Sequence, residues 1–230
     1  MKKLILITIL ILSFALIQGA YAAGDIGSVV ALRGGAVINR DAKHLDARVK
    51  DGIQLRDIVE KKTQSRAKML FVDDSVLTLG ESSRAIIKEF FYSKEKGGST
   101  VVNLVDGKMR SVVGRGNFEV HTATAVAAAR GTVIDFEAGK INGKDYTTIT
   151  CLEGELDVKS IDPTIVGRVI LRAGMTVTIM GGQAPPTPQP AVKTAADGTV
   201  TAQQLLQQAT PINQQPTAKT TTPITIEVRF

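Results

Sequence analysis

Short segments in which apolar and polar residues alternate recur along most of this chain. Between residues 26 and 180 they include 67–72, 76–79, 85–90, 147–152 and 175–180. This two-residue period is typical of β-strands, because successive side chains of a strand point to opposite faces of a sheet. Turn-forming pairs such as Asp106-Gly107 and Asn142-Gly143 separate the segments. Only 124–129 tolerates a helix, and six residues are too few for a stable one. The sequence therefore predicts an all-β domain.

A loose internal repeat refines this prediction. An apolar residue, a glycine and a second apolar residue recur around Gly107, Gly154 and Gly174. Such recurrence suits stacked β-coils, in which each unit buries one face against the next. Strands at a spacing of roughly ten residues are also compatible with a sandwich or a barrel. We expect a short β-solenoid or β-coil-like domain over residues 23–181.

The amino terminus has the order of a secretory signal peptide. Lys2 and Lys3 precede an apolar run, and small residues at Ala20 and Ala22 form a cleavage site. The apolar run of 14 residues is shorter than the ~20 that a membrane span needs. We expect cleavage of residues 1–22, with an uncleaved membrane anchor as the alternative. The mature protein would then be periplasmic or at the cell surface, with no transmembrane span.

The carboxyl-terminal part differs in composition. Seven of the eight prolines follow Gly182, in a stretch rich in Gln, Thr and Ala that predicts a low-complexity linker over 182–222. Residues 223–230 alternate again and predict a terminal strand, with one face formed by Ile224, Ile226, Val228 and Phe230. This strand could return to the sheet edge of this protein. Alternatively, it could bind a partner by adding to the edge of the partner's sheet.

The sequence offers little for catalysis. The chain has two histidines and one cysteine, which give no zinc-site spacing and no internal disulfide. Cys151 alternates with its neighbours as a small buried residue would, and Asp73 and Asp74 fit a tight turn better than a calcium loop. We expect no enzyme activity, metal or cofactor. A polysaccharide hydrolase remains an alternative, and it would need paired carboxylates from Asp73, Asp74, Glu153 and Glu155.

The charge distribution bears on partners. The formal net charge is +6, but basic and acidic residues are interspersed along the sequence and aromatic residues make up 4%. Nucleic-acid binding favours a basic stripe or aromatic stacking platforms. We therefore expect no nucleic-acid partner and a solvated, mildly basic surface.

Several motifs together resemble the FecR domain, the periplasmic domain of ferric-citrate-type regulators and of many exported relatives. The residues that carry the resemblance are Asp57, Asp73, Ser75, Thr122, Arg130, Gly131, Thr132, Gly154 and Gly174. The resemblance covers about residues 26–180 and implies a coiled all-β fold in which these residues are structural or contribute to binding. For Arg130 the sequence favours a buried strut over a clamp for a ligand carboxylate.

The chain also departs from the family pattern. Arg56 and Asp74 stand where the family usually has glycine, which puts the local turn conformations in doubt. Regulators of the family hold a sigma factor with a cytoplasmic segment, whereas only three residues precede the apolar run here. We expect an exported binding module whose partner is an envelope protein or a component of the cell wall or outer membrane. A structural or adhesive envelope component is the alternative.

Overall fold

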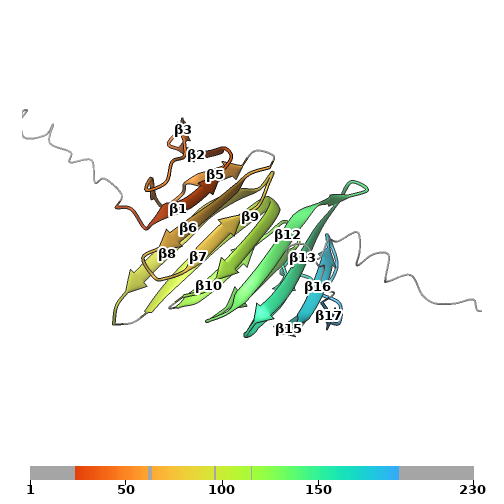
Figure 1. The fold of residues 1–230 in the computed structure, drawn as a ribbon. Coiled ribbons are helices and arrows are strands. Elements are labelled where there is room, and N and C mark those ends of the chain that lie inside the picture. Colours follow the sequence, from red (N-terminus) through yellow and green to blue (C-terminus); the bar gives the residue numbers. More distant parts are fainter. Residues whose placement is uncertain (1–23, 62–63, 96, 115, 192–230) are drawn as a thin grey trace, which may run out of the picture.

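The computed structural model describes residues 24–61, 64–95, 97–114 and 116–191. In these residues every regular element is a strand, so the all-β prediction is confirmed. The strands succeed one another along the length of the molecule, with β1 toward one end and β17 at the other (Figure 1). Together they form one open, mixed, 17-stranded sheet. This sheet folds over into two layers, named here sheet A and sheet B.

The bounds and spatial order of the strands follow from their pairing. Sheet A contains β4 (Gly52–Ile53), β1 (Gly27–Arg33), β6 (Arg66–Phe71), β7 (Val76–Leu79), β9 (Gly97–Val112), β12 (Val133–Ile141), β13 (Lys144–Glu153), β16 (Met175–Met180) and β17 (Gln189–Pro190). Sheet B contains β3 (Lys43–Asp46), β2 (Ala36–Arg40), β5 (Ile58–Lys61), β8 (Arg84–Ser93), β9 again, β10 (Asn117–His121), β11 (Ala125–Ala129), β14 (Glu155–Ser160) and β15 (Arg168–Arg172).

Strand β9 belongs to both layers. The first part of this 16-residue strand pairs with β8 and, in parallel, with β10 in sheet B. Its last part pairs with β7 and β12 in sheet A. The change of layer occurs at Gly107, which has a φ of 85°. A Cβ there would lie 2.5 Å from the Cα of Ser83, so the crossing requires glycine.

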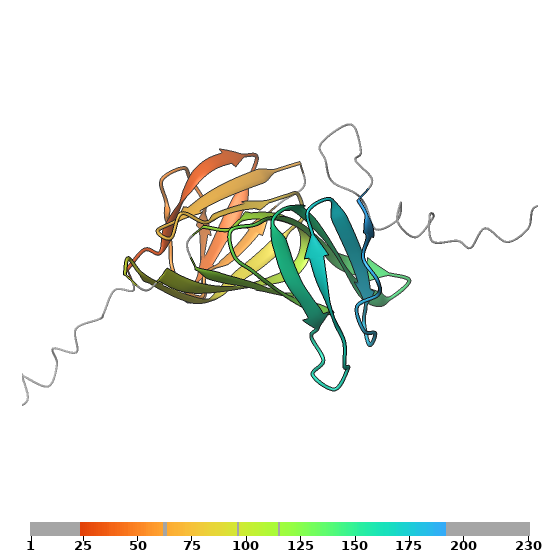
Figure 2. The ribbon, with the colours of Figure 1, turned by 90° about the horizontal axis from the view of Figure 1, so that it is seen from below.

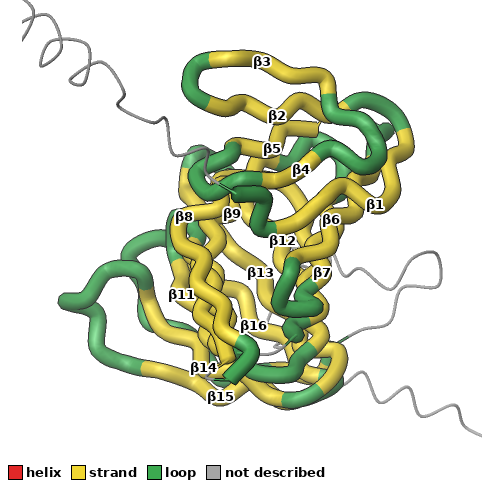
Figure 3. The backbone as a smooth tube through the Cα atoms, turned by 90° about the vertical axis from the view of Figure 1, so that its left-hand side faces the viewer, coloured by secondary structure: helices red, strands yellow, loops and turns green. Residues whose placement is uncertain are grey.

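The hydrophobic core fills the space between the two layers, which face each other in Figures 2 and 3. Its largest fully buried side chains include Phe71 and Phe136 from sheet A and Phe118 from sheet B. The period-two pattern supplies them, because every second residue of a strand faces inward. In β6, for example, Ala67, Met69 and Phe71 are buried while the residues between them are exposed.

The glycines of the sequence repeat mark where the chain changes layer. Gly107 lies between the sheet B and sheet A parts of β9, Gly154 between β13 and β14, and Gly174 between β15 and β16. All three have positive φ. The repeat therefore consists of a strand in one layer, a crossing glycine and a strand in the other. Hairpins are added alternately to the two layers.

Segment 124–129 and the carboxyl-terminal end of the sheet differ from the simplest expectation from the sequence. The segment is not helical, since Ala125–Ala129 forms β11 between β10 and β14. The sheet continues beyond the expected linker boundary at residue 182, because β17 pairs with β16 and Ala191 donates to the Gly174 carbonyl at 2.8 Å. The expected signal peptide, residues 192–222 of the linker and the terminal strand with Ile224, Ile226, Val228 and Phe230 lie outside the described residues. Within the described part of the chain, no helix has the length and apolar character to cross a membrane.

Candidate binding site

Asp57 forms a bidentate ion pair with Arg40. Its carboxylate accepts hydrogen bonds from Arg40 Nε at 2.8 Å and from an Arg40 terminal nitrogen at 2.6 Å. The backbone N–H of Gln54 adds a third, at 2.8 Å. Arg40 also donates to the Gly52 carbonyl, and its hydrogen bond to Asp57 raises the pKa of the guanidinium. These hydrogen bonds connect Arg40 on β2 with the chain that follows β4. Because Asp57 is fully buried, its carboxylate is not accessible to a ligand.

Asp73 and Ser75 form the tight turn between β6 and β7, as the sequence predicted. The Asp73 carboxylate accepts hydrogen bonds from the backbone N–H and the hydroxyl of Ser75, both at 3.0 Å, and from the Thr100 hydroxyl at 3.3 Å. The Ser75 Oγ accepts the backbone N–H of Gly114 at 2.9 Å. This network ties the turn in sheet A to β9 in sheet B and to the chain that follows β9.

Thr122 belongs to a second polar connection between the layers. Its hydroxyl lies 2.7 Å from that of Thr147 on β13, and the Thr124 hydroxyl donates to Thr147 at 2.8 Å. Thr124 also contacts the Ile179 carbonyl of β16 at 3.1 Å. All three threonines are buried, so the turn between β10 and β11 is anchored to sheet A.

Thr132 packs against Gly154, whereas Gly131 and Gly174 are needed for their positive φ. A Cβ on Gly154, where φ is 80°, would lie 2.7 Å from the Thr132 Cγ2. Gly131 has a φ of 57° and provides the left-handed turn that precedes β12. Gly174 donates its backbone N–H to the Cys151 carbonyl at 2.8 Å. Cys151 itself is fully buried, and burial raises the pKa of its thiol, as expected for a small core residue.

Arg130 corrects an expectation, because it is exposed rather than a buried strut. Its Nε donates to the Asn117 Oδ1. The two side chains line a small cleft of about 310 Å³ together with Gly98, Gly114, Gly116 and Gly131. A guanidinium held at one point over glycine backbone can accept a small anion, so the ligand-clamp alternative fits this geometry better.

Arg56 and Asp74 adopt the backbone conformation that glycine would favour. Their φ values are 69° and 67°, in the left-handed region, and both side chains are exposed. The doubt about these turns is therefore resolved: the turn geometry is present despite the substitutions. An L-residue in this region costs roughly 1–2 kcal/mol, and an aspartate tolerates it better than an arginine.

Replacing Arg56 with glycine is therefore expected to raise the free energy of unfolding by about 0.5–1 kcal/mol, after allowing for the greater unfolded-state entropy of glycine. Arg48 is exposed and lacks a positive φ, so Arg48→Gly is the matched control and is expected to lower stability. Urea unfolding midpoints measure both changes. A decrease for Arg56→Gly as large as that for the control would contradict the strain argument.

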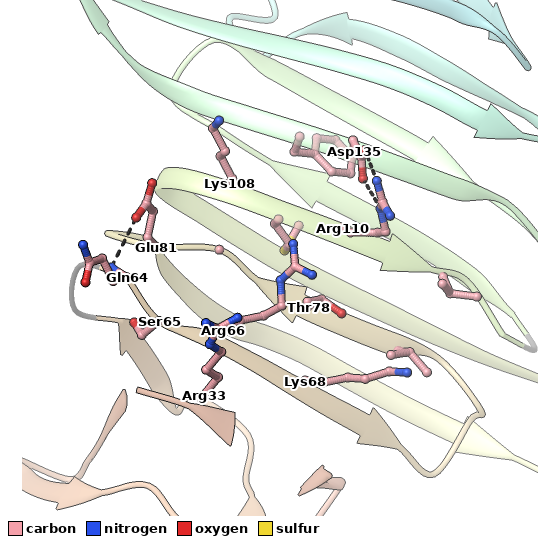
Figure 4. Close-up of a pocket in the computed structure, with 15 residues that line it drawn as sticks. Arg33, Gln64, Ser65, Arg66, Lys68, Thr78, Glu81, Lys108, Arg110 and Asp135 are labelled. Atoms are coloured by element: carbon pink, nitrogen blue, oxygen red, sulfur yellow. Dashed lines mark hydrogen bonds and ion pairs between the residues drawn. The ribbon is translucent and has the colours of Figure 1, made fainter. Parts of the chain in front are cut away.

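A groove on the outer face of sheet A has a volume of about 810 Å³ (Figure 4). Five basic side chains line it: Arg33, Arg66, Lys68, Lys108 and Arg110. Two acidic side chains are also present, of which Asp135 accepts two hydrogen bonds of 2.6 Å from Arg110 and Glu81 accepts one from the backbone N–H of Gln64. The basic cluster was not predicted from the sequence because its members are dispersed over β1, β6 and β9. Cross-strand register brings them together.

Asp73 and Glu153, two of the carboxylates considered for hydrolysis, are far apart. Asp73 lies in the turn before β7 and Glu153 ends β13, so β9 and β12 separate them in sheet A. Three strand spacings correspond to about 14 Å. A glycosidase needs its two carboxylates roughly 5–9.5 Å apart. Among the described residues no group of histidine, cysteine, aspartate and glutamate side chains could hold a metal ion. His44 lies on β3 with its side chain exposed, and His121 is the last residue of β10.

Comparison with known families identifies the central part of this fold. The FecR protein family model matches residues 57–157, so this part of the chain is similar to a FecR domain. The match runs from the buried Asp57 through the crossing at Gly154. It includes all of the hallmark residues named above except Gly174.

Two solved structures of one protein also resemble the chain. They are crystal structures, at 2.50 and 1.65 Å resolution, of a candidate anti-sigma factor from Parabacteroides distasonis. Each is 12% identical, with a TM-score of 0.46, and the likeness covers 58% of this chain and 59% of that one. The chain thus matches less than two thirds of that protein. The comparison with curated proteins found no match.

Proposed function

We propose that this protein is an exported binding module of the cell envelope, similar to the sensor domain of FecR-type regulators, and that it acts by binding a partner protein without catalysing a reaction. The observation that carries the proposal is the similarity of residues 57–157 to a FecR domain. The buried hallmark residues Asp73 and Thr122 connect the two layers through internal hydrogen bonds to Thr100 and Thr147. This arrangement leaves the exposed faces and edges of the sheets for recognition.

The proposal includes the parts of the chain that flank the described domain. A signal peptide ending at Ala22 would place the mature protein in the periplasm or at the cell surface. The alternation of hairpins between layers, with glycine at the crossings at residues 107, 154 and 174, supports a short β-coil as the form of the domain. The linker would present the terminal strand 223–230 to the edge of a partner's sheet, where main-chain hydrogen bonds supply affinity.

A cross-linked pull-down from the native envelope tests this function. The baits are the mature chain 23–230 and a chain ending at Ala191, the last described residue, which donates a hydrogen bond to the Gly174 carbonyl. We expect one envelope protein to be enriched at least tenfold with the longer bait and to be lost with the shorter one.

A third bait with the order of residues 223–230 scrambled controls for composition, and it is expected to capture as little as the shorter bait. Equal capture by all three baits would contradict strand addition. Stable association with wall or outer membrane without one stoichiometric partner would favour the structural or adhesive alternative.

A further inference from the structure

The groove on sheet A has an ordered arrangement of side chains. Its floor is formed by Val76 and Thr78 of β7 and by Gly80, which follows β7, and none of these residues is charged. On one side β6 presents Arg66, Lys68 and Leu70 at two-residue spacing, and on the other β9 presents Lys108, Arg110 and Val112. Cross-strand register aligns the two sides: Lys68 and Arg110 both lie opposite Thr78, and Leu70 and Val112 both lie opposite Val76.

The groove therefore consists of three parallel rows across the sheet. The first row is basic and is formed by Arg66 and Lys108 around Gly80. The second is basic and is formed by Lys68 and Arg110 around Thr78. The third is apolar and is formed by Leu70, Val76 and Val112. Successive rows are about 7 Å apart, because alternate residues of a strand are separated by that distance.

Four of the five basic side chains of the groove form no ion pair with another described residue. Within the described part of the chain, the side chains of Arg33, Arg66, Lys68 and Lys108 make no hydrogen bond or ion pair. Arg33 lies directly opposite Arg66 in the register of β1 and β6, and like charges in this position repel each other. A ligand that brings negative charge to this wall would relieve the repulsion.

Strand β12 shows which residues pair with the basic and apolar side chains of β9. Its outward residues Glu137, Asp135 and Val133 lie opposite Lys108, Arg110 and Val112 in the register of sheet A. Asp135 and Arg110 form a bidentate pair at 2.6 Å. Two acidic residues and one apolar residue, at alternate positions of β12, thus already pair with the side chains of β9 on the side away from β7. The β6 wall has the same order of basic and apolar residues without such a neighbour.

We propose that the groove binds an extended acidic segment of the partner protein, with carboxylates at alternate positions followed by an apolar side chain. An extended peptide repeats its side chains every ~7 Å on one face, so two carboxylates reach the two basic rows and the apolar residue reaches the third. Arginine and carboxylate form the two-point hydrogen bonds that give such contacts their geometry. This inference rests on the proposed binding function and names the chemistry of the partner.

Fluorescence anisotropy with synthetic peptides tests the spacing. The probes are labelled peptides with Glu-Thr-Glu-Thr-Val and its reverse order, and the comparison peptide is Glu-Glu-Thr-Thr-Val, of the same composition. We expect an alternating probe to bind mature 23–230 at least tenfold more tightly than the comparison peptide. Affinity is expected to weaken with added salt, since exposed charges are screened.

Charge reversal tests the site. Arg66→Glu with Lys68→Glu is expected to weaken binding of the alternating probe by at least tenfold, and Arg66→Gln with Lys68→Gln by a smaller factor. Lys43 and Lys159 are exposed lysines outside the groove, so Lys43→Glu with Lys159→Glu is the matched control for net charge and is expected to change little. Circular dichroism and unfolding midpoints confirm that each variant is folded.

Three outcomes would overturn the inference: equal affinity for the alternating and comparison peptides, equal loss in the groove and control variants, or stronger binding of polygalacturonate than of either peptide. The last would indicate an anionic glycan. If a partner is captured equally by wild-type and charge-reversed baits, the groove inference fails while the binding function stands. If the alternating probe binds through the groove but no partner is captured, the binding function fails instead.

Discussion

Replacing Lys61 with methionine is expected to raise the free energy of unfolding at pH 7 by about 2 kcal/mol. Lys61 occupies an inward position of β5, two residues after Val59, and its side chain is 6% exposed. Among the described residues its ammonium group has no hydrogen-bond partner. Desolvation by burial lowers the pKa of this amine to about 8 from the ordinary 10.5. The folded protein therefore holds a charge that its surroundings disfavour, and methionine has a similar length without that charge.

The pH dependence distinguishes this cause from improved packing. Below pH 8 the amine is protonated in both the folded and the unfolded state, so the full penalty is present. Between about pH 8 and 10.5 the folded state releases its proton first, and the wild-type protein gains stability as the pH rises. The advantage of Lys61→Met is expected to decline across this interval.

Denaturant unfolding at several pH values measures the difference between the two proteins. Lys159 is an exposed lysine, and Lys159→Met is expected to change stability by less than about 0.5 kcal/mol at every pH. A constant advantage for Lys61→Met between pH 7 and 10.5 would show that the charge is not the cause. A loss of stability at pH 7 would show that Lys61 has a favourable partner.

Replacing Gly114 with alanine is expected to lower the free energy of unfolding by about 3 kcal/mol. A Cβ at this position would lie 2.2 Å from the Asp73 carbonyl oxygen and 2.7 Å from the backbone N of Ser75. These are backbone atoms of the turn between β6 and β7, which cannot rotate away as a side chain can. The same turn carries the hydrogen bonds among Asp73, Ser75 and Thr100. The added methyl group would push apart the contacts that connect the turn to β9.

Thermal and urea unfolding measure this loss, and Gly139→Ala provides the control. Gly139 lies within β12, and the nearest atom to its added Cβ, Tyr146 Cε1, is 3.4 Å away. The control is expected to change stability by less than about 0.5 kcal/mol. Equal and small effects of the two substitutions would mean that the turn and the Gly114 segment are not held as closely as described.

The fold was largely predictable because its determinants are local. Period-two alternation identified strands such as 76–79 and 175–180, which form β7 and β16 with the same bounds. The repeat glycines pointed to a recurring unit, and each lies at a change of layer. The layer to which each hairpin belongs was not predictable, because it depends on pairing between distant strands. Strand β11 was ambiguous because alanine is small enough to suit a helix, and its position between two strands decides its conformation.

The candidate site was predictable only in part, for a related reason. Asp57, Asp73 and Thr122 were identified from a sequence pattern, but their burial shows that they position the sheets. The basic residues of the groove were read as interspersed, which is true along the chain. Arg66 and Lys108 come together only because β7 pairs with both β6 and β9. A surface that arises from register between strands has no signature in local composition.

The shared strand β9 has a consequence for how the domain loses its structure. Each of its two parts has strands paired on both sides, in a different layer. We expect that neither layer unfolds alone, because releasing β9 from one layer also disturbs the pairing of its other part, which is connected to it through Gly107. We therefore expect all-or-none unfolding, with the amide protons of β9 exchanging with solvent at the rate of global opening.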